Sequence, residues 1–92
     1  MPEHLLEIAR EHFRSGRAPQ AVGLCEQVLQ SHPEYPAALH LLGCIAYQKN
    51  QLGIATQLLA RAVRRDGSIA EYYHDLGRVH EADGRPEAAI AS

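Results

Sequence analysis

The feature that most constrains this chain is a pattern of small residues that repeats every 34 residues. Gly43 recurs as Gly77, and Ala55 recurs as Ala89, with Ala21 one period earlier and no insertion between units. A period of this length is typical of solenoids in which every unit is a helix, a turn and a second helix. We therefore expect a single array of three units, the last one truncated, at about 2–35, 36–69 and 70–92.

Apolar residues within each unit have the spacing of a helix. Leu39, Leu42 and Ala46 follow the i, i+3, i+7 pattern, and the alternation that a strand needs is missing. The same stripe joins Leu5, Ile8 and His12 in the first unit and Tyr73, Leu76 and His80 in the third. We predict helices at Glu3 to Ser15, Pro19 to Ser31, Pro36 to Lys49, Leu52 to Arg65 and Ile69 to Ala82, with a sixth beginning near Pro86.

Two sets of residues indicate how the hairpins close. Turns are predicted at residue types that tolerate a left-handed backbone, namely Gly16, Asn50 and Gly84. Close helix contacts are predicted where side chains are small, because a large side chain would hold the helices apart. On this basis the first helices face the second through three pairs, Ala9 with Ala21, Gly43 with Ala55 and Gly77 with Ala89.

The segments LHLLGCIAYQKNQLGIATQLLARAV and YYHDLGRVHEADGRPEAAIA resemble tetratricopeptide repeats, with Leu-Gly, a later Ala and then Ala-Val. The resemblance covers essentially the whole chain, although the closing proline, kept as Pro33, is replaced by Gly67. It implies an all-α, right-handed solenoid of antiparallel hairpins that serves as a protein-protein interaction scaffold. It further implies the N-terminal segment of a larger, bacterial-type protein.

The resemblance also implies where a partner binds, because the first helices of such hairpins line a concave groove. By analogy with the family, the groove residues are Leu6, Arg10, Phe13, Arg14, His40, Leu41, Cys44, Tyr47, Gln48, His74, Asp75, Arg78 and Glu81. Apolar and aromatic side chains flanked by Arg10 and Arg78 would suit an extended peptide with apolar and acidic character. The alternative is that Phe13 and Tyr47 mainly pack between hairpins and that the arginines are solvated surface.

Two binding modes of the family do not fit the residues of this sequence. The asparagine positions of a lysine and asparagine clamp for a C-terminal carboxylate hold Arg10 and Leu41, and its third-repeat basic positions hold Glu71 and Asp75. An asparagine ladder, as in members attached to glycosyltransferases, would need asparagine where Glu7, Leu41 and Asp75 stand.

Composition argues against several other classes of function. The formal charge is only -2, so no strong field attracts nucleic acid or anionic lipid, and no apolar run could span a bilayer. We expect a cytoplasmic protein without a cofactor, and reduced thiols at Cys25 and Cys44.

Catalytic and metal-binding residues are not predicted. No two histidines are three or four residues apart on one helix, as a helical pair of metal ligands requires. Cys44 and His40 are an i, i+4 pair and can touch, but a helix interior offers no free N–H groups for an oxyanion hole.

Only Pro86 to Ser92 remain for the last second helix, so the array ends within a hairpin. We expect this chain to be the N-terminal piece of a longer protein, with an uncapped end through which it could self-associate. Two alternatives stay open. The chain could be a targeting or oligomerisation arm of a larger enzyme, such as a glycosyltransferase or methyltransferase with its catalytic domain beyond Ser92, or it could be a structural spacer.

Overall fold

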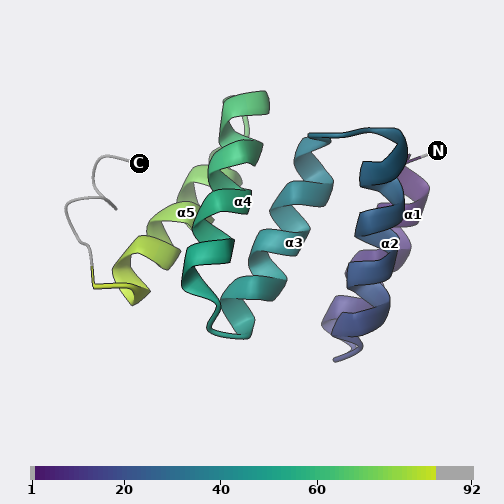
Figure 1. The fold of residues 1–92 in the computed structure, drawn as a ribbon, viewed down its shortest axis with the longest axis horizontal. Helices are drawn as coiled ribbons and strands as arrows, with labels where there is room; N and C mark the ends of the chain where they lie inside the picture. The colour runs from purple at the N-terminus through teal and green to yellow at the C-terminus, as the bar shows by residue number, and fades with distance from the viewer. Residues whose placement is uncertain (1, 85–92) are drawn as a thin grey trace.

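The computed structural model describes residues 2–84, which form helices joined by short turns and contain no strand (Figure 1). They are α1 (Pro2–Arg14), α2 (Ala18–Ser31), α3 (Pro36–Gln48), α4 (Leu52–Arg65) and α5 (Ala70–Ala82). The predicted all-α solenoid is confirmed, and each predicted helix ends within one residue of the observed one. The predicted sixth helix and its contact residue Ala89 lie outside the described residues.

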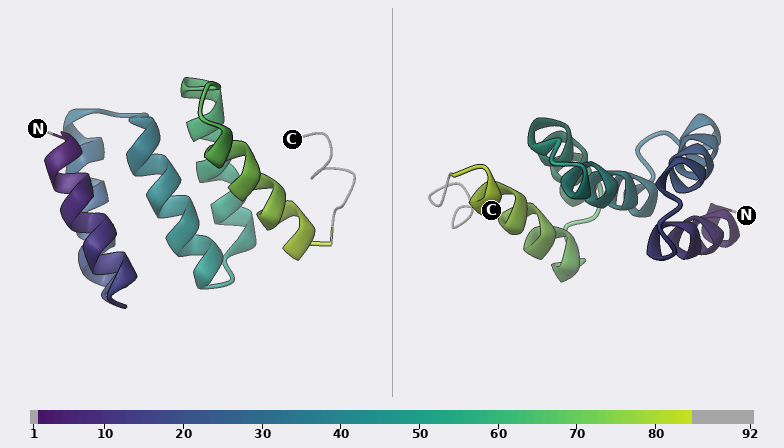
Figure 2. Two further views of the ribbon diagram at one scale, coloured as in Figure 1. Left: turned by 180° about the vertical axis from the view of Figure 1, so that it is seen from behind. Right: turned by 90° about the horizontal axis from the view of Figure 1, so that it is seen from below.

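The helices form antiparallel hairpins that stack along the molecule. Helix α1 packs on α2 and α3 packs on α4, while contacts of α2 with α3 and of α4 with α5 join successive units. The first helices α1, α3 and α5 line up on one face (Figure 2, left). Viewed from below, α3 is recessed between α1 and α5, which makes this face concave (Figure 2, right).

The turns within the hairpins have the predicted left-handed residues. Gly16, Asn50 and Gly84 have φ values of 81°, 62° and 73°. The first two turns are closed by equivalent backbone hydrogen bonds, from Arg17 N–H to the His12 carbonyl at 2.7 Å and from Gln51 N–H to the Ala46 carbonyl at 2.8 Å. Such bonds satisfy carbonyl groups that a helix end leaves unpaired.

Small residues allow the close contact inside each hairpin. Ala9, Ala21 and Ala55 are fully buried. At Gly43, an added Cβ would lie 2.7 Å from Leu59 Cγ, so this glycine is required by the close approach of α3 to α4. The nearest side chain to Gly43 is thus Leu59, one turn beyond the predicted partner Ala55.

Two members of the predicted apolar stripes are more exposed than expected, Ile8 and Tyr73, each at 38%. Leu42, one period after Ile8, packs against the core cluster of the first hairpin. Leu39, one period before Tyr73, packs with Ala62 and Tyr72. The same repeat position is therefore buried to different degrees in different units.

No helix within residues 2–84 combines the length and the apolar character that crossing a membrane would take.

Candidate binding groove

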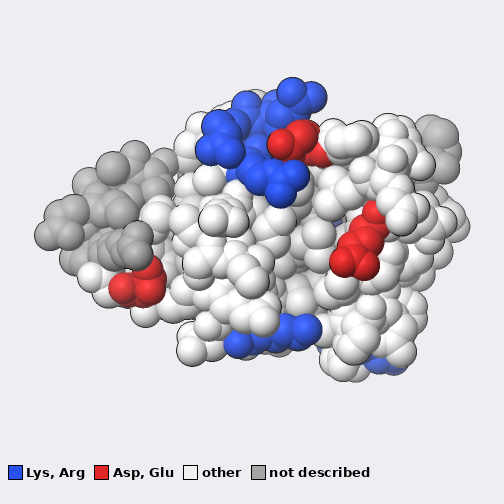
Figure 3. Space-filling view, viewed as in Figure 1, with Lys and Arg blue, Asp and Glu red and all other residues white. Residues whose placement is uncertain are grey.

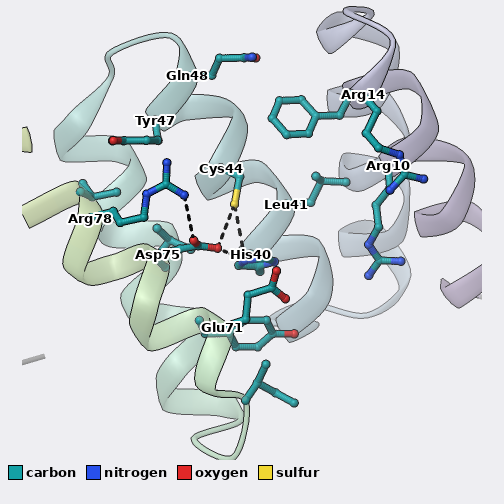
Figure 4. Close-up of a pocket in the computed structure, with 15 residues that line it drawn as sticks. Arg10, Arg14, His40, Leu41, Cys44, Tyr47, Gln48, Glu71, Asp75 and Arg78 are labelled. Carbon is teal, nitrogen blue, oxygen red and sulfur yellow. Dashed lines mark hydrogen bonds and ion pairs between the residues drawn. The ribbon is translucent and has the colours of Figure 1, made fainter.

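A cavity of about 570 Å³ opens on the face formed by the first helices (Figure 4). We call its lining the groove. It consists of Arg10, Phe13, Arg14, His40, Leu41, Cys44, Tyr47, Gln48, Leu59, Ile69, Glu71, Tyr72, Asp75, Arg78 and Val79. Most of these side chains come from α1, α3 and α5, so three successive units contribute to one surface.

Most of the residues expected in the groove lie there. From α1 these are Arg10, Phe13 and Arg14; from α3 and α5 they are His40, Leu41, Cys44, Tyr47, Gln48, Asp75 and Arg78. His74 and Glu81 are exposed on α5 and do not line the cavity.

The placement of Leu6 in the groove must be corrected. Its side chain has no exposed surface and belongs to the core cluster with Ala9, Ala38 and Leu41. Helix α3 covers it, since Ala38 and Leu41 both come from that helix. A residue in this position stabilises the stack and is not accessible to a partner.

At the centre of the groove, three side chains form a compact polar group that we call the His40 cluster: His40, Cys44 and Asp75 (Figure 4). His40 Nε2 lies 2.7 Å from Asp75 Oδ2 and 3.5 Å from Cys44 Sγ, and the thiol lies 3.6 Å from the same carboxylate oxygen. The contact of His40 with Cys44 that the i, i+4 spacing allows is therefore present. The convergence of Asp75 on this pair was not predicted.

Neighbouring contacts hold the His40 cluster in place. The imidazole stacks on Tyr72 with ring centroids 4.6 Å apart, and Tyr72 is itself packed into the core with Leu39 and Ala62. The side chains of His40 and Asp75 are only 14% and 15% exposed. The outer carboxylate oxygen of Asp75 lies 3.7 Å from the guanidinium of Arg78. The cluster is thus fixed from α3 and from α5.

Burial and charge keep the Cys44 thiol protonated. Loss of solvation, followed by the negative charge and hydrogen bonding of Asp75, raises the pKa of Cys44 to about 12. A nucleophilic cysteine needs the opposite shift, because the thiolate is the reactive form. The contact of His40 with Cys44 therefore does not make an activated nucleophile.

The remaining groove residues combine apolar walls with basic groups. Phe13 and Tyr47 are half-buried, and each packs against a core cluster while also lining the cavity. The guanidinium of Arg78 lies 5.4 Å from the centre of the Tyr47 ring, within the range of a cation–π contact. Both aromatic side chains therefore pack against the core and also line the cavity.

The arginines of the groove differ in their pairing. Arg14 is bonded to Glu11 at 2.7 Å, whereas Arg10 has no hydrogen bond or ion pair within residues 2–84. An unpaired guanidinium beside an apolar wall is available to an acidic group of a partner.

Sequence reasoning missed Leu59, Ile69, Glu71, Tyr72 and Val79 as groove residues. One of them carried a usable signal, because Glu71 precedes Asp75 by four residues and so shares its helix face. Leu59, on α4, reaches the cavity at the point where Gly43 leaves space in α3. That opening depends on helix packing and has no local sequence signal.

Helical hairpins stacked at a constant period, with one face hollowed by their first helices, define an α-helical repeat protein. The particular family follows from a match of the tetratricopeptide repeat family model to residues 12–78. The chain belongs to the tetratricopeptide repeat family.

Similar proteins include a glycosyltransferase and a protein named for its tetratricopeptide repeats. A UDP-N-acetylglucosamine–peptide N-acetylglucosaminyltransferase of Caenorhabditis elegans is 31% identical over 90% of this chain and 7% of its own length. Human tetratricopeptide repeat protein 7A is 29% identical over 82% of this chain and 9% of its own length. This chain thus spans less than a tenth of either relative.

Solved structures agree in fold. A mutant O-GlcNAc transferase of Thermobaculum terrenum superposes with a TM-score of 0.93 at 39% identity, covering 98% of this chain and 17% of the other. The structure of MamA superposes with a TM-score of 0.86 at 22% identity, covering 98% of this chain and 53% of the other, and shows the shared fold alone.

Proposed function

We propose that this chain is a protein-recognition scaffold that binds an extended peptide segment in its groove. The observation that carries the proposal is the cavity of about 570 Å³ to which three successive first helices contribute. A volume of this size lies within the range of about 300 to 1,000 Å³ found for ligand sites. An extended segment crossing the helices would contact all three units at once.

The side chains of the groove favour a peptide with both apolar and acidic residues. Phe13 and Tyr47 offer apolar surface above the nearly buried Leu41. Arg10 and Arg78 lie at the two sides of this surface, on α1 and α5. Tyrosine and arginine are the residue types that most often dominate binding energy in protein interfaces. Arg10, unpaired within the described residues, would receive a carboxylate of the peptide.

A charge-matched pair of double variants tests the groove. Peptides are first selected from a random display library on the unmodified protein. The double variant Arg10→Ala/Arg78→Ala is expected to bind them about thirtyfold more weakly, a loss of about 2 kcal/mol in binding free energy. Fluorescence anisotropy with a labelled selected peptide measures the affinity. The reason for the loss is that both guanidinium groups contact the peptide within the groove.

The control is Arg64→Ala/Arg65→Ala, which removes the same charge from the last turn of α4. Basic side chains gather over that end of α4 on the opposite face of the molecule (Figure 3). This variant is expected to bind the peptide as the unmodified protein does. An equal loss in both double variants would show general attraction between charges and would reject groove binding.

A second candidate function is that of a non-catalytic arm of a larger enzyme, in particular a glycosyltransferase. It is supported by 31% identity to the nematode transferase and 39% identity to the bacterial one. The full-length reading frame decides this candidate, since a glycosyltransferase domain encoded beyond Ser92 is required.

Self-association through the C-terminal end is compatible with either function. A light-scattering mass above that of the monomer would support it.

A further inference from the structure

We infer that His40, Cys44 and Asp75 form a binding site for one divalent transition-metal ion of the zinc class. Their candidate ligand atoms all lie within 4.8 Å of one another. Imidazole nitrogen, thiolate sulfur and carboxylate oxygen are the three kinds of ligand that proteins use for zinc. The inference does not rest on the proposed peptide recognition, but the three residues lie at the centre of the same groove.

The distances between the donors match a tetrahedral ion. With zinc bonds of about 2.3 Å to sulfur and about 2.0 Å to nitrogen and oxygen, tetrahedral geometry puts sulfur about 3.5 Å from either partner. The observed distances from Cys44 Sγ are 3.5 Å to His40 Nε2 and 3.6 Å to Asp75 Oδ2. The nitrogen and oxygen, now 2.7 Å apart in a hydrogen bond, would separate to about 3.3 Å. Small side-chain rotations are enough for this change.

The charges of the site also suit a divalent cation. A thiolate and a carboxylate together neutralise two positive charges, and the thiol proton leaves to solvent when the ion binds. Asp75 would use Oδ2 for the ion while Oδ1 keeps its contact with Arg78. The stacking of His40 on Tyr72 holds the imidazole in place, as supporting contacts do in established metal sites.

A fourth position is open toward the cavity. Glu71 lies four residues before Asp75 on α5 and lines the same cavity, so its carboxylate or a water molecule would complete the coordination. In Figure 4, Glu71 extends into the cavity beside His40. Because the ligands come from α3 and α5, the ion would connect the second and third units and raise the melting temperature.

Titration calorimetry with zinc chloride on protein without a polyhistidine tag tests the site. One ion per chain is expected, and His40→Gln, Cys44→Ser and Asp75→Asn should each bind at least about tenfold more weakly, since disturbing only supporting residues already costs that much. With cobalt in place of zinc, the thiolate-to-metal absorption band should be present in the unmodified protein and absent in Cys44→Ser. His74→Gln, which changes an exposed histidine of α5 outside the cluster, should bind like the unmodified protein.

Several results would overturn the site: absence of zinc binding, wild-type affinity in Cys44→Ser or Asp75→Asn, or a cobalt band that survives in Cys44→Ser and so comes from Cys25.

A second measurement, of the alkylation rate of Cys44, needs no variant. Saturating zinc should slow alkylation of Cys44 in the unmodified protein at least about tenfold, as read by peptide mass spectrometry, because the ion occupies the sulfur. Unchanged alkylation of Cys44 would reject coordination by its thiol.

Discussion

Gly43→Leu is expected to destabilise the protein by about 3 kcal/mol. The reason is that even a Cβ at this position would lie 2.7 Å from Leu59 Cγ and 3.0 Å from Leu59 Cδ2, and Leu59 is fully buried. Either α3 must move away from α4 or Leu59 must leave its position. A domain of this size has a stability of about 5 to 14 kcal/mol, so a large fraction would be lost. Urea denaturation followed by circular dichroism measures the change.

Gly23 supplies the control for this substitution. It lies inside α2, where an added Cβ would meet nothing within 4 Å. Gly23→Ala is expected to stabilise the protein by about 0.5 to 1 kcal/mol, because alanine favours the helix over glycine without any clash. If Gly43→Leu proved as harmless as Gly23→Ala, the close packing of α3 on α4 would be wrong.

Leu6→Ala is expected to cost about 2 to 5 kcal/mol of stability. The side chain of Leu6 is fully buried among residues of α1, α2 and α3, and its removal leaves a cavity that the neighbouring backbone cannot fill. Thermal denaturation measures the change, with a fall in melting temperature of about 4 to 8 °C for each kcal/mol.

Ile8→Ala is the matched variant, because it truncates another aliphatic residue of α1 that is 38% exposed. Its expected cost is about 1 kcal/mol or less. Equal losses from both variants would show that Leu6 is no more buried than Ile8. The groove assignment of Leu6 would then have to be restored.

The fold could be predicted because its signals are local and repeat. The period of 34 residues predicts where each hairpin lies in the sequence. Gly16 and Asn50 indicate turns, because their left-handed backbone depends mainly on the residue type. Glu34 also adopts a positive φ, of 65°, without any such signal. Its carboxylate accepts a hydrogen bond from Arg61 at 2.8 Å, which joins the first unit to the second.

The site could be predicted only in part, because repeat position identifies a helix face but not what covers it. His40 lines the cavity as expected, whereas Leu6, at the same repeat position one period earlier, lies under α3. The spacing of the histidines gives no signal for the His40 cluster, which joins three residue types from two helices. Asp75 reaches His40 from 35 residues away, and that contact depends on how α5 is set against α3.

Mapping a selected peptide onto the protein by two-dimensional NMR tests the central claim most directly. Amide shift changes on titration should concentrate on α1, α3 and α5, with the largest near Arg10, Cys44 and Arg78, because these residues line the groove from three successive units. Shift changes confined to α2 and α4 would place the binding surface on the opposite face and would contradict groove recognition.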